Sequence, residues 1–336
     1  MPTFCRHGRF IERCRICSKD LPGQDPAPRH SARVSRSSTA RSRTAARQPA
    51  GGAGAGLRVR RELREQDDGY RAGLAPGLRA SADARRLAEE IGFSSARLIG
   101  LAVDPPGCYG QAGGLRDTDM EAATWLCLLI AYLCPLDGED PWAGIRLALE
   151  RLPEPGAVSS ADALADVPLG PRSSHEPGRG TATLSAYVQW IGRAGGGSQS
   201  LAISGDLEWA PERRFERVFE RLALPGLSRT ARYEFLVLLG RLGLYPLGAG
   251  SLQLGGSRAS SAEDLTAAAA KRVFGIAEPL LLERRARELA DAAGVPIEAL
   301  DLALWNWAAP TRATLGFPAD SGDRSAAARA AAALGL

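Results

Sequence analysis

The sequence contains no apolar run that approaches the ~20 residues needed to cross a membrane. Its first residues also lack the hydrophobic stretch of a secretory signal. Cysteine is scarce, and the 6 cysteines lie partly in one short cluster and partly in apolar segments. This distribution fits a reducing compartment better than a disulfide framework. We therefore expect a cytoplasmic protein without a membrane partner.

Lysine is almost absent, since Lys19 and Lys271 are the only two and nearly all cations are arginines. A GC-rich genome would produce the same bias, so the abundance of arginine alone indicates little. The formal net charge of +4 is compatible with a nucleic-acid partner without being diagnostic of one. Hydrophobic residues make up 45% of the 336 residues, which is enough for one large domain or two smaller ones.

A cluster of zinc-binding residue types lies within residues 1–20. Cys5 and His7 are followed, after six intervening residues, by Cys14 and Cys17. Zinc takes four sulfur or imidazole ligands tetrahedrally, and a Cys-x-x-Cys pair can hold one edge of the tetrahedron. We predict a zinc-knuckle-like segment with about one structural zinc per chain. A chance spacing with an exposed, redox-sensitive pair is the alternative.

Composition divides the rest of the chain into three segments. Residues 21–56 have too little apolar surface to offset the entropy of ordering, so we predict a disordered basic linker that attracts nucleic acid or acts as an inert tether. Residues 57–310 show helical periodicities, without repeats or a strand ladder, and predict a mainly α domain. The alanine-rich residues 311–336 are expected to form a loosely attached tail.

Two amphipathic helices joined by a very short turn are predicted between residues 211 and 245. The turn at 224–227 reads Leu-Pro-Gly-Leu. Proline ends the first helix, Gly226 tolerates the positive φ of a tight reversal, and Ser228 can cap the second helix through its hydroxyl.

The turn suits a phosphate group, because no side chain stands in front of the amides around Gly226 and the following helix start carries partial positive charge. Arginines lie beside that helix start and farther along the chain. The residues predicted to contact DNA are Leu224, Pro225, Gly226, Leu227, Arg229, Arg232 and Arg272. A plain helical hairpin within a core is the alternative that this pattern leaves open.

The irregular segment 153–180 carries further candidates, because loops hold functional side chains more often than helices do. Arg172 and Arg179 could bind a phosphate, and His175 could move a proton. Lys271 is the single lysine of the predicted domain and is the favoured individual cation. These four residues are our catalytic candidates, and the alternative is a surface loop with incidental cations.

The hairpin resembles the helix-hairpin-helix of the DNA glycosylase superfamily. From about residue 69 to 307 the chain also resembles the alpha-glutamyl/putrescinyl thymine pyrophosphorylases, in particular their clade 3. The order and spacing of several motifs support this resemblance more than any single one does. They are Gly-Tyr-Arg-Ala-Gly-Leu at 69–74, Ala-Thr-Trp-Leu at 123–126, Gly-Pro-Arg-x-x-His at 170–175, Arg-Arg-Phe at 213–215, the turn at 224–227, Ala-Lys-Arg-Val-Phe-Gly at 270–275 and Leu-Ala-Leu-Trp-Asn-Trp at 302–307.

The resemblance implies a helical, glycosylase-like fold and action on a modified thymine in DNA. The implied reaction starts from 5-hydroxymethyluracil that carries a diphosphate on its hydroxymethyl group, and an amine such as glutamate or putrescine displaces pyrophosphate. The modified base must flip out of the duplex, arginines must match the charge of the leaving diphosphate, and a proton acceptor must deprotonate the amine. The expected partners are therefore DNA with a flipped base and a small amine donor.

One departure from the glycosylases concerns the carboxylate that base excision requires. Those enzymes place an aspartate at the start of the helix after the hairpin, and alignment on Arg272 and Val273 puts Ala267 at that position. Asp264 and Glu263 lie nearly one turn earlier, where the spacing does not fit. We therefore expect no ordinary base excision.

Two other hypotheses stay open beside the transferase. One is a non-catalytic protein that holds DNA or modified bases, and a weaker one is a glycosylase with a relocated carboxylate. If Arg172, His175 and Lys271 share one cavity, the enzyme is favoured. If they lie apart, binding is favoured.

Overall fold

The computed structural model of the chain describes residues 66–159, 161–206, 208–255 and 264–336. Every regular element in these ranges is a helix, which confirms the prediction of a mainly α fold. The helices are α2 (Ser81–Val103), α3 (Gly107–Gly114), α4 (Met120–Leu133), α5 (Ala143–Arg151), α6 (Ala182–Gly195), α7 (Gln199–Ser204), α8 (Pro211–Arg221), α9 (Arg229–Arg241), α10 (Leu265–Phe274), α11 (Pro279–Ala293), α12 (Glu298–Ala308) and α13 (Arg324–Leu334), with the short 3-10 turns η3 (Pro155–Ala157), η4 (Ala161–Leu164) and η5 (Pro177–Arg179). The predicted zinc-knuckle-like segment 1–20 and the linker 21–56 lie outside the described residues.

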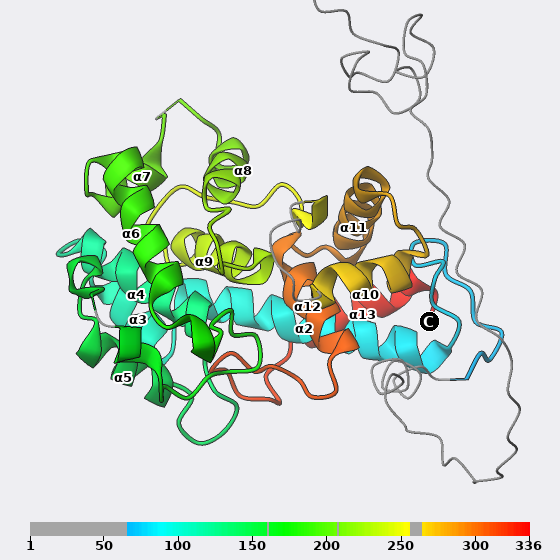
Figure 1. Cartoon of the computed structure of the whole chain (residues 1–336). Helices are drawn as coiled ribbons and strands as arrows, with labels where there is room; N and C mark the ends of the chain where they lie inside the picture. Colours follow the sequence, from blue (N-terminus) through cyan, green and yellow to red (C-terminus); the bar gives the residue numbers. More distant parts are fainter. Residues whose placement is uncertain (1–65, 160, 207, 256–263) are drawn as a thin grey trace, which may run out of the picture. The chain divides into compact units, whose positions relative to one another are not determined.

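The described helices form two groups (Figure 1). Helices α3 to α9 make up one group, in which α4 packs against α3, α5, α7 and α9. Helices α10 to α13 make up the other, in which α12 and α13 pack against the long helix α2. Because α2 also contacts α9, it joins the two groups. Within the described ranges, no helix combines the length and the apolar character of a bilayer-spanning segment.

Helix α4 is the buried centre of its group. Asp119 caps its N-terminus, since the carboxylate accepts the amide of Ala122 at 2.9 Å. Every residue from Ala123 to Leu133 is buried. The sequence places apolar side chains on most sides of this helix, and neighbouring helices cover those sides in the structure.

The C-terminal segment 311–336 packs into the fold, which corrects our expectation of a loosely attached tail. Helix α13 lies along α2, and Ala326 and Leu334 on it are fully buried. Gly92 of α2 permits this approach, because a Cβ at that position would lie 2.7 Å from the methyl group of Ala327. Small side chains thus let the two helices come close enough to pack, although the segment contains few large apolar residues.

A close backbone contact fixes the segment 66–80 to the C-terminal end of α10. The amide of Gly77 donates to the carbonyl of Val273 at 2.9 Å. A Cβ on Gly77 would lie 1.9 Å from the carbonyl oxygen of Arg272 and 2.8 Å from the amide nitrogen of Gly275. Since both neighbours are backbone atoms, neither can rotate away from an added methyl group.

Replacing Gly77 with alanine should therefore lower the free energy of unfolding by about 1–3 kcal/mol, the usual cost of overpacking. Denaturant-induced unfolding of the purified variant measures this change. Gly73→Ala is the matched control, because a Cβ at Gly73 meets no atom within 4 Å. The control should leave stability unchanged or slightly raised. Equal unfolding free energies for the two variants would contradict the close contact.

Candidate functional site

The two helices and the short turn lie where the sequence predicts them, as α8, residues 224–227 and α9. Ser228 caps α9, and its hydroxyl accepts a backbone amide of the first turn at 3.1 Å. The amide of Leu227 donates to the carbonyl of Leu224 at 3.1 Å, and Gly226 has a φ of +80°. These are the features of a type II turn with glycine at its third position.

Ser174 ties the loop before α6 to this turn. Its hydroxyl donates to the carbonyl of Gly226 at 2.9 Å and accepts the amide of Ser228 at 2.8 Å. One of the amides that we expected to face a phosphate is therefore bonded inside the protein. The amide of Gly226 has no acceptor within the described ranges, so it remains the donor that an anion could use.

Two further side chains pack directly against Gly226. A Cβ there would lie 2.1 Å from Oγ1 of Thr183 and 2.8 Å from Cδ of Arg179. Glycine is therefore required at this position for two reasons, the close packing and the positive φ. Thr183 is 1% exposed, and its hydroxyl makes no hydrogen bond of standard geometry in the described structure. The guanidinium of Arg179 pairs with Glu176 at 2.9 Å and remains about one-third exposed. It therefore offers positive charge to solvent beside the turn.

His175 lies on the same loop and is 6% exposed. Its Nδ1 is 2.9 Å from the hydroxyl of Tyr132, and its Nε2 makes no hydrogen bond of standard geometry within the described ranges. Burial lowers the pKa of His175, while the Leu164 carbonyl and the Glu176 carboxylate act in the opposite direction. Burial raises the pKa of Tyr132. Both side chains are therefore neutral at pH 7, and Nε2 of His175 is buried in this conformation.

These contacts bring predicted residues from two parts of the chain to one place. His175 and Arg179 come from the loop before α6, and Gly226 comes from the hairpin turn. We call this place the hairpin junction and define it as Ser174, His175, Arg179, Thr183 and Gly226. The sequence reading did not single out the two hydroxyl residues. Ser174 stands within the quoted motif at 170–175, whereas no local signal marks Thr183.

Arg172 and Arg229 lie elsewhere, in a buried network centred on Asp301 of α12. The two arginines bind different oxygens of this carboxylate, each at 2.5 Å. Arg229 also pairs with Asp264, which caps α10. Burial acts to raise the pKa of Asp301, but the charges of Arg229 and Arg172 outweigh it and hold the pKa below its ordinary value. The carboxylate is therefore ionised at neutral pH.

The network continues through Glu234 of α9 into α2. Glu234 pairs with Arg97 and lies 3.7 Å from Arg172. Arg97 also contacts the hydroxyl of Tyr109, which donates to a backbone carbonyl at 3.1 Å. Three arginines thus face three carboxylates across the boundary between the two helix groups. We call this set the ion-pair network; it consists of Arg97, Arg172, Arg229, Glu234, Asp264 and Asp301.

The burial of the hairpin arginines differs from our expectation that they lie beside a bound phosphate. Arg229 and Arg232 are each 2% exposed. Arg232 donates to the carbonyl of Phe219 at 3.2 Å and stacks over its ring at 4.3 Å. Burial and the nearby charge of Arg229 lower the pKa of Arg232 to about 10. The structure therefore gives both arginines interior partners rather than a surface position.

A very small cavity of about 10 Å³ adjoins Arg172. Its lining includes Cys134, Thr230, Glu234 and Leu315, and Arg172 contributes a guanidinium whose Nε makes no hydrogen bond within the described ranges. Cys134 and Leu315 both have positive φ values, of 62° and 52°. The volume admits about one water molecule and no nucleobase. In this conformation a flipped base therefore has no room beside Arg172.

Lys271 and Arg272 lie at a third place, the C-terminal end of α10. Both line a hollow of about 580 Å³ between that helix end and the segment 66–80. Arg172, His175 and Lys271 thus do not share a cavity in the part of the chain that the structure describes. A shared cavity was expected for an enzyme, so this separation favours a non-catalytic DNA-binding protein. Only His175 of these three lies at the hairpin junction.

The helix that follows the hairpin region begins with a carboxylate, at Asp264 rather than at Ala267. The Asp264 side chain accepts the amide of Ala267 at 3.3 Å and caps α10. The sequence places Asp264 nearly one turn before the expected aspartate, and the cap lies three residues upstream of Ala267. Arg229 occupies the carboxylate, so its charge is already matched inside the protein.

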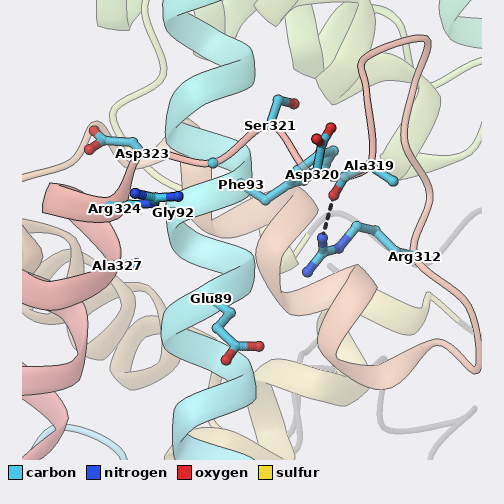
Figure 2. A pocket seen from close by; sticks show the side chains of 11 residues that line it. Glu89, Gly92, Phe93, Arg312, Ala319, Asp320, Ser321, Asp323, Arg324 and Ala327 are labelled. Atoms are coloured by element: carbon cyan, nitrogen blue, oxygen red, sulfur yellow. Dashed lines mark hydrogen bonds between the residues drawn. The ribbon is translucent and has the colours of Figure 1, made fainter.

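A further hollow, of about 260 Å³, lies between α2 and the N-terminal end of α13 (Figure 2). Arg312 extends into it and donates to the carbonyl of Ala319 at 2.8 Å, shown dashed in Figure 2. The same guanidinium binds Glu90 at 2.7 Å. None of the predicted site residues lines this hollow, and its arginine already holds the loop before α13.

Among the residues that the structure describes, no group of three or more His, Cys, Asp or Glu side chains is suited to a metal ion. The predicted zinc ligands Cys5, His7, Cys14 and Cys17 lie outside those residues.

Residues 173–315 match the family model described as alpha-glutamyl/putrescinyl thymine pyrophosphorylase clade 3. The match confirms, over this range, the resemblance that the sequence motifs suggested. It covers the loop of the hairpin junction, the hairpin itself and helices α10 to α12. Searches of curated proteins and of solved structures return no match.

Proposed function

We propose, from the match of residues 173–315 to a thymine pyrophosphorylase family, that the chain is a transferase acting on a modified thymine in DNA. The substrate base is 5-hydroxymethyluracil with a diphosphate on its hydroxymethyl oxygen. The amine nitrogen forms a bond to the methylene carbon while the carbon–oxygen bond breaks. The electron pair of the broken carbon–oxygen bond leaves with pyrophosphate, and a proton passes from the nitrogen to a proton acceptor. The base must leave the duplex to expose its methylene carbon.

The hairpin junction is our proposed site for the phosphate groups. The single observation that carries the proposal is the meeting of Arg179, Thr183 and Gly226 at the turn. They offer a partly exposed guanidinium and a backbone amide without an acceptor in the described ranges, beside the buried hydroxyl of Thr183. Fixed donors of these kinds match the charge that gathers on a leaving diphosphate.

His175 is the proposed proton acceptor. It must be neutral to accept the proton that the attacking amine nitrogen releases, and its lowered pKa keeps it neutral at pH 7. Tyr132 holds the ring through Nδ1, which leaves Nε2, buried in this conformation, as the nitrogen that would take the proton. The amine donor itself is a small molecule whose identity the reaction leaves open.

A non-catalytic DNA-binding protein is the second candidate. The separation of Arg172, His175 and Lys271 favours it, because two of the proposed catalytic groups lie away from the hairpin junction. A glycosylase with a relocated carboxylate has Asp264 as its natural candidate. The pairing of Asp264 with Arg229 opposes that activity, since a carboxylate neutralised by arginine stabilises an oxocarbenium ion poorly.

Mass analysis of nucleosides tests the three candidates together. The full chain is incubated with duplex DNA containing 5-hydroxymethyluracil diphosphate and with glutamate or putrescine. A nucleoside carrying the amine supports the transferase. Release of free base without an amine adduct supports the glycosylase. Unchanged nucleosides in the presence of measurable DNA binding support the binding protein and exclude the transferase for these donors.

We also propose that Cys5, His7, Cys14 and Cys17 bind a structural zinc ion, on the basis of their spacing alone. A cytoplasmic location remains part of the proposal on the same sequence grounds.

A further inference from the structure

The hollow at the C-terminal end of α10 is lined by three cations and by no carboxylate. Arg79 comes from the segment 66–80, and Lys271 and Arg272 come from the last turn of α10. The hollow measures about 580 Å³ and is open to solvent. We call it the basic hollow.

The backbone holds the two walls of the basic hollow together. The hydrogen bond from Gly77 to Val273 and the close approach of Gly77 to Gly275 fix the segment 66–80 against α10. Figure 1 shows this segment lying beside the end of α10. Arg79 is two residues from Gly77, so its Cα is fixed relative to Lys271. The three cations therefore belong to one rigid surface rather than to separate loops.

Two of the three cations in the basic hollow, Arg79 and Lys271, have no ion pair within the described ranges. Arg79 and Lys271 are exposed, and neither forms an ion pair or a side-chain hydrogen bond there. The guanidinium of Arg272 stacks over the ring of Trp307 at 4.7 Å, which fixes the plane of its donors. Asp67 is within electrostatic range of Arg79, but it is exposed and pairs with Arg71 at 3.3 Å.

The helix dipole accounts for only part of this arrangement. Cations in the last turn of a helix offset the partial negative charge of its end, which explains Lys271 and Arg272. Arg79 belongs to no helix and is brought to the same surface by the contact of Gly77. A third cation on an already compensated helix end points to an external anion.

We propose that the basic hollow binds the phosphodiester backbone of duplex DNA, as a second contact separate from the hairpin junction. The inference rests on the proposed function, because it takes DNA as the partner. A polyanion with regularly spaced phosphates suits three cations on one rigid, concave surface better than a single small anion does. Contacts of this kind position the duplex without reading its sequence.

Salt-dependent binding of plain duplex DNA tests the proposal. Each phosphate contact contributes about −0.9 to the slope of log K against log salt concentration. Fluorescence anisotropy of a labelled duplex without modified bases, from about 50 to 200 mM salt, gives this slope for the full chain. The test variants are Arg79→Ala, Lys271→Ala and the double variant, and Arg193→Ala in the last turn of α6 is the control.

The double variant should bind at least about 10-fold more weakly at low salt and show a slope shallower by about two. Arg193 is an exposed arginine in the last turn of a helix and lines none of the hollows described above, so its variant should match the wild type. Circular dichroism checks that every variant is folded. A double variant with the wild-type affinity and slope would overturn the proposal, as would a wild-type protein that does not bind plain duplex DNA.

The nucleoside assay, run on the same proteins at saturating DNA, separates this inference from the proposed function. One outcome is that the wild-type protein transfers the amine while the salt slope of DNA binding is the same in the Arg79 and Lys271 variants. That result contradicts DNA binding by the basic hollow and leaves the transferase standing. The expected change of slope in a protein that never forms an amine adduct contradicts the transferase alone.

Discussion

Replacing Asp301 with asparagine should lower the free energy of unfolding by about 3–5 kcal/mol. The substitution keeps the size of the side chain but leaves the charges of Arg172 and Arg229 without their shared carboxylate. Both arginines are buried and each lies 2.5 Å from Asp301. Removing one partner of a buried pair is costly because the remaining charge cannot return to water. Chemical unfolding monitored by circular dichroism measures the loss.

Asp291→Asn is the matched control for this variant. Asp291 lies exposed near the end of α11, so its replacement should change stability by less than about 0.5 kcal/mol. Similar losses for both variants would show that Asp301 contributes no more than a surface carboxylate.

The same variant should remove part of the acid sensitivity of the protein. The pKa of Asp301 in the folded state lies below its ordinary value of 3.8, so its contribution is fully present above that value. The contribution is lost as the pH falls through the lowered pKa. The stability difference between wild type and Asp301→Asn should therefore shrink below about pH 3.8.

Replacing His175 with glutamine should reduce the rate of amine transfer by about 10²- to 10⁴-fold, the usual contribution of a positioned proton acceptor. Glutamine keeps a hydrogen-bonding side chain toward Tyr132 but cannot accept a proton. In the wild type the rate should rise with pH through the pKa of His175, which burial places below the ordinary 6.5. Initial rates of adduct formation, measured across this pH range, give both results.

Tyr132→Phe is the control, because it removes the hydroxyl that holds Nδ1 and leaves Nε2 in place. It should slow transfer less than the glutamine variant does. Thermal unfolding of both variants separates a chemical role from a structural one. A glutamine variant that transfers the amine at the wild-type rate would exclude His175 as the proton acceptor.

The parts of the fold that sequence reading predicted well are those determined by neighbouring residues. The turn at 224–227 and the Ser228 cap depend on glycine, proline and a hydroxyl within a few positions of one another. Local chemistry is visible in a single sequence, so the two helices and the turn between them were predicted where the structure has them. The continuous apolar run of α4 likewise predicted a core helix.

Features that depend on distant partners could not be predicted in this way. Arg229 looks like a phosphate ligand beside a helix start, and only the carboxylate of Asp301, 72 residues away, shows that it is an interior residue. Helix α13 was expected to be loosely attached because its alanines add little hydrophobicity. Its packing depends on Gly92 in α2, which the sequence does not mark as a partner. Long-range pairing, not propensity, explains both differences.

The ion-pair network has a consequence for how related sequences can diverge. Substitution of a single member leaves an unpaired charge in the interior. A sequence in which Asp301 is replaced therefore also needs uncharged residues in place of Arg172 and Arg229. We expect these three positions to change together or not at all. Three apolar residues at the same positions are the other arrangement that we expect to be stable. Co-variation among homologous chains would then trace the boundary between the two helix groups.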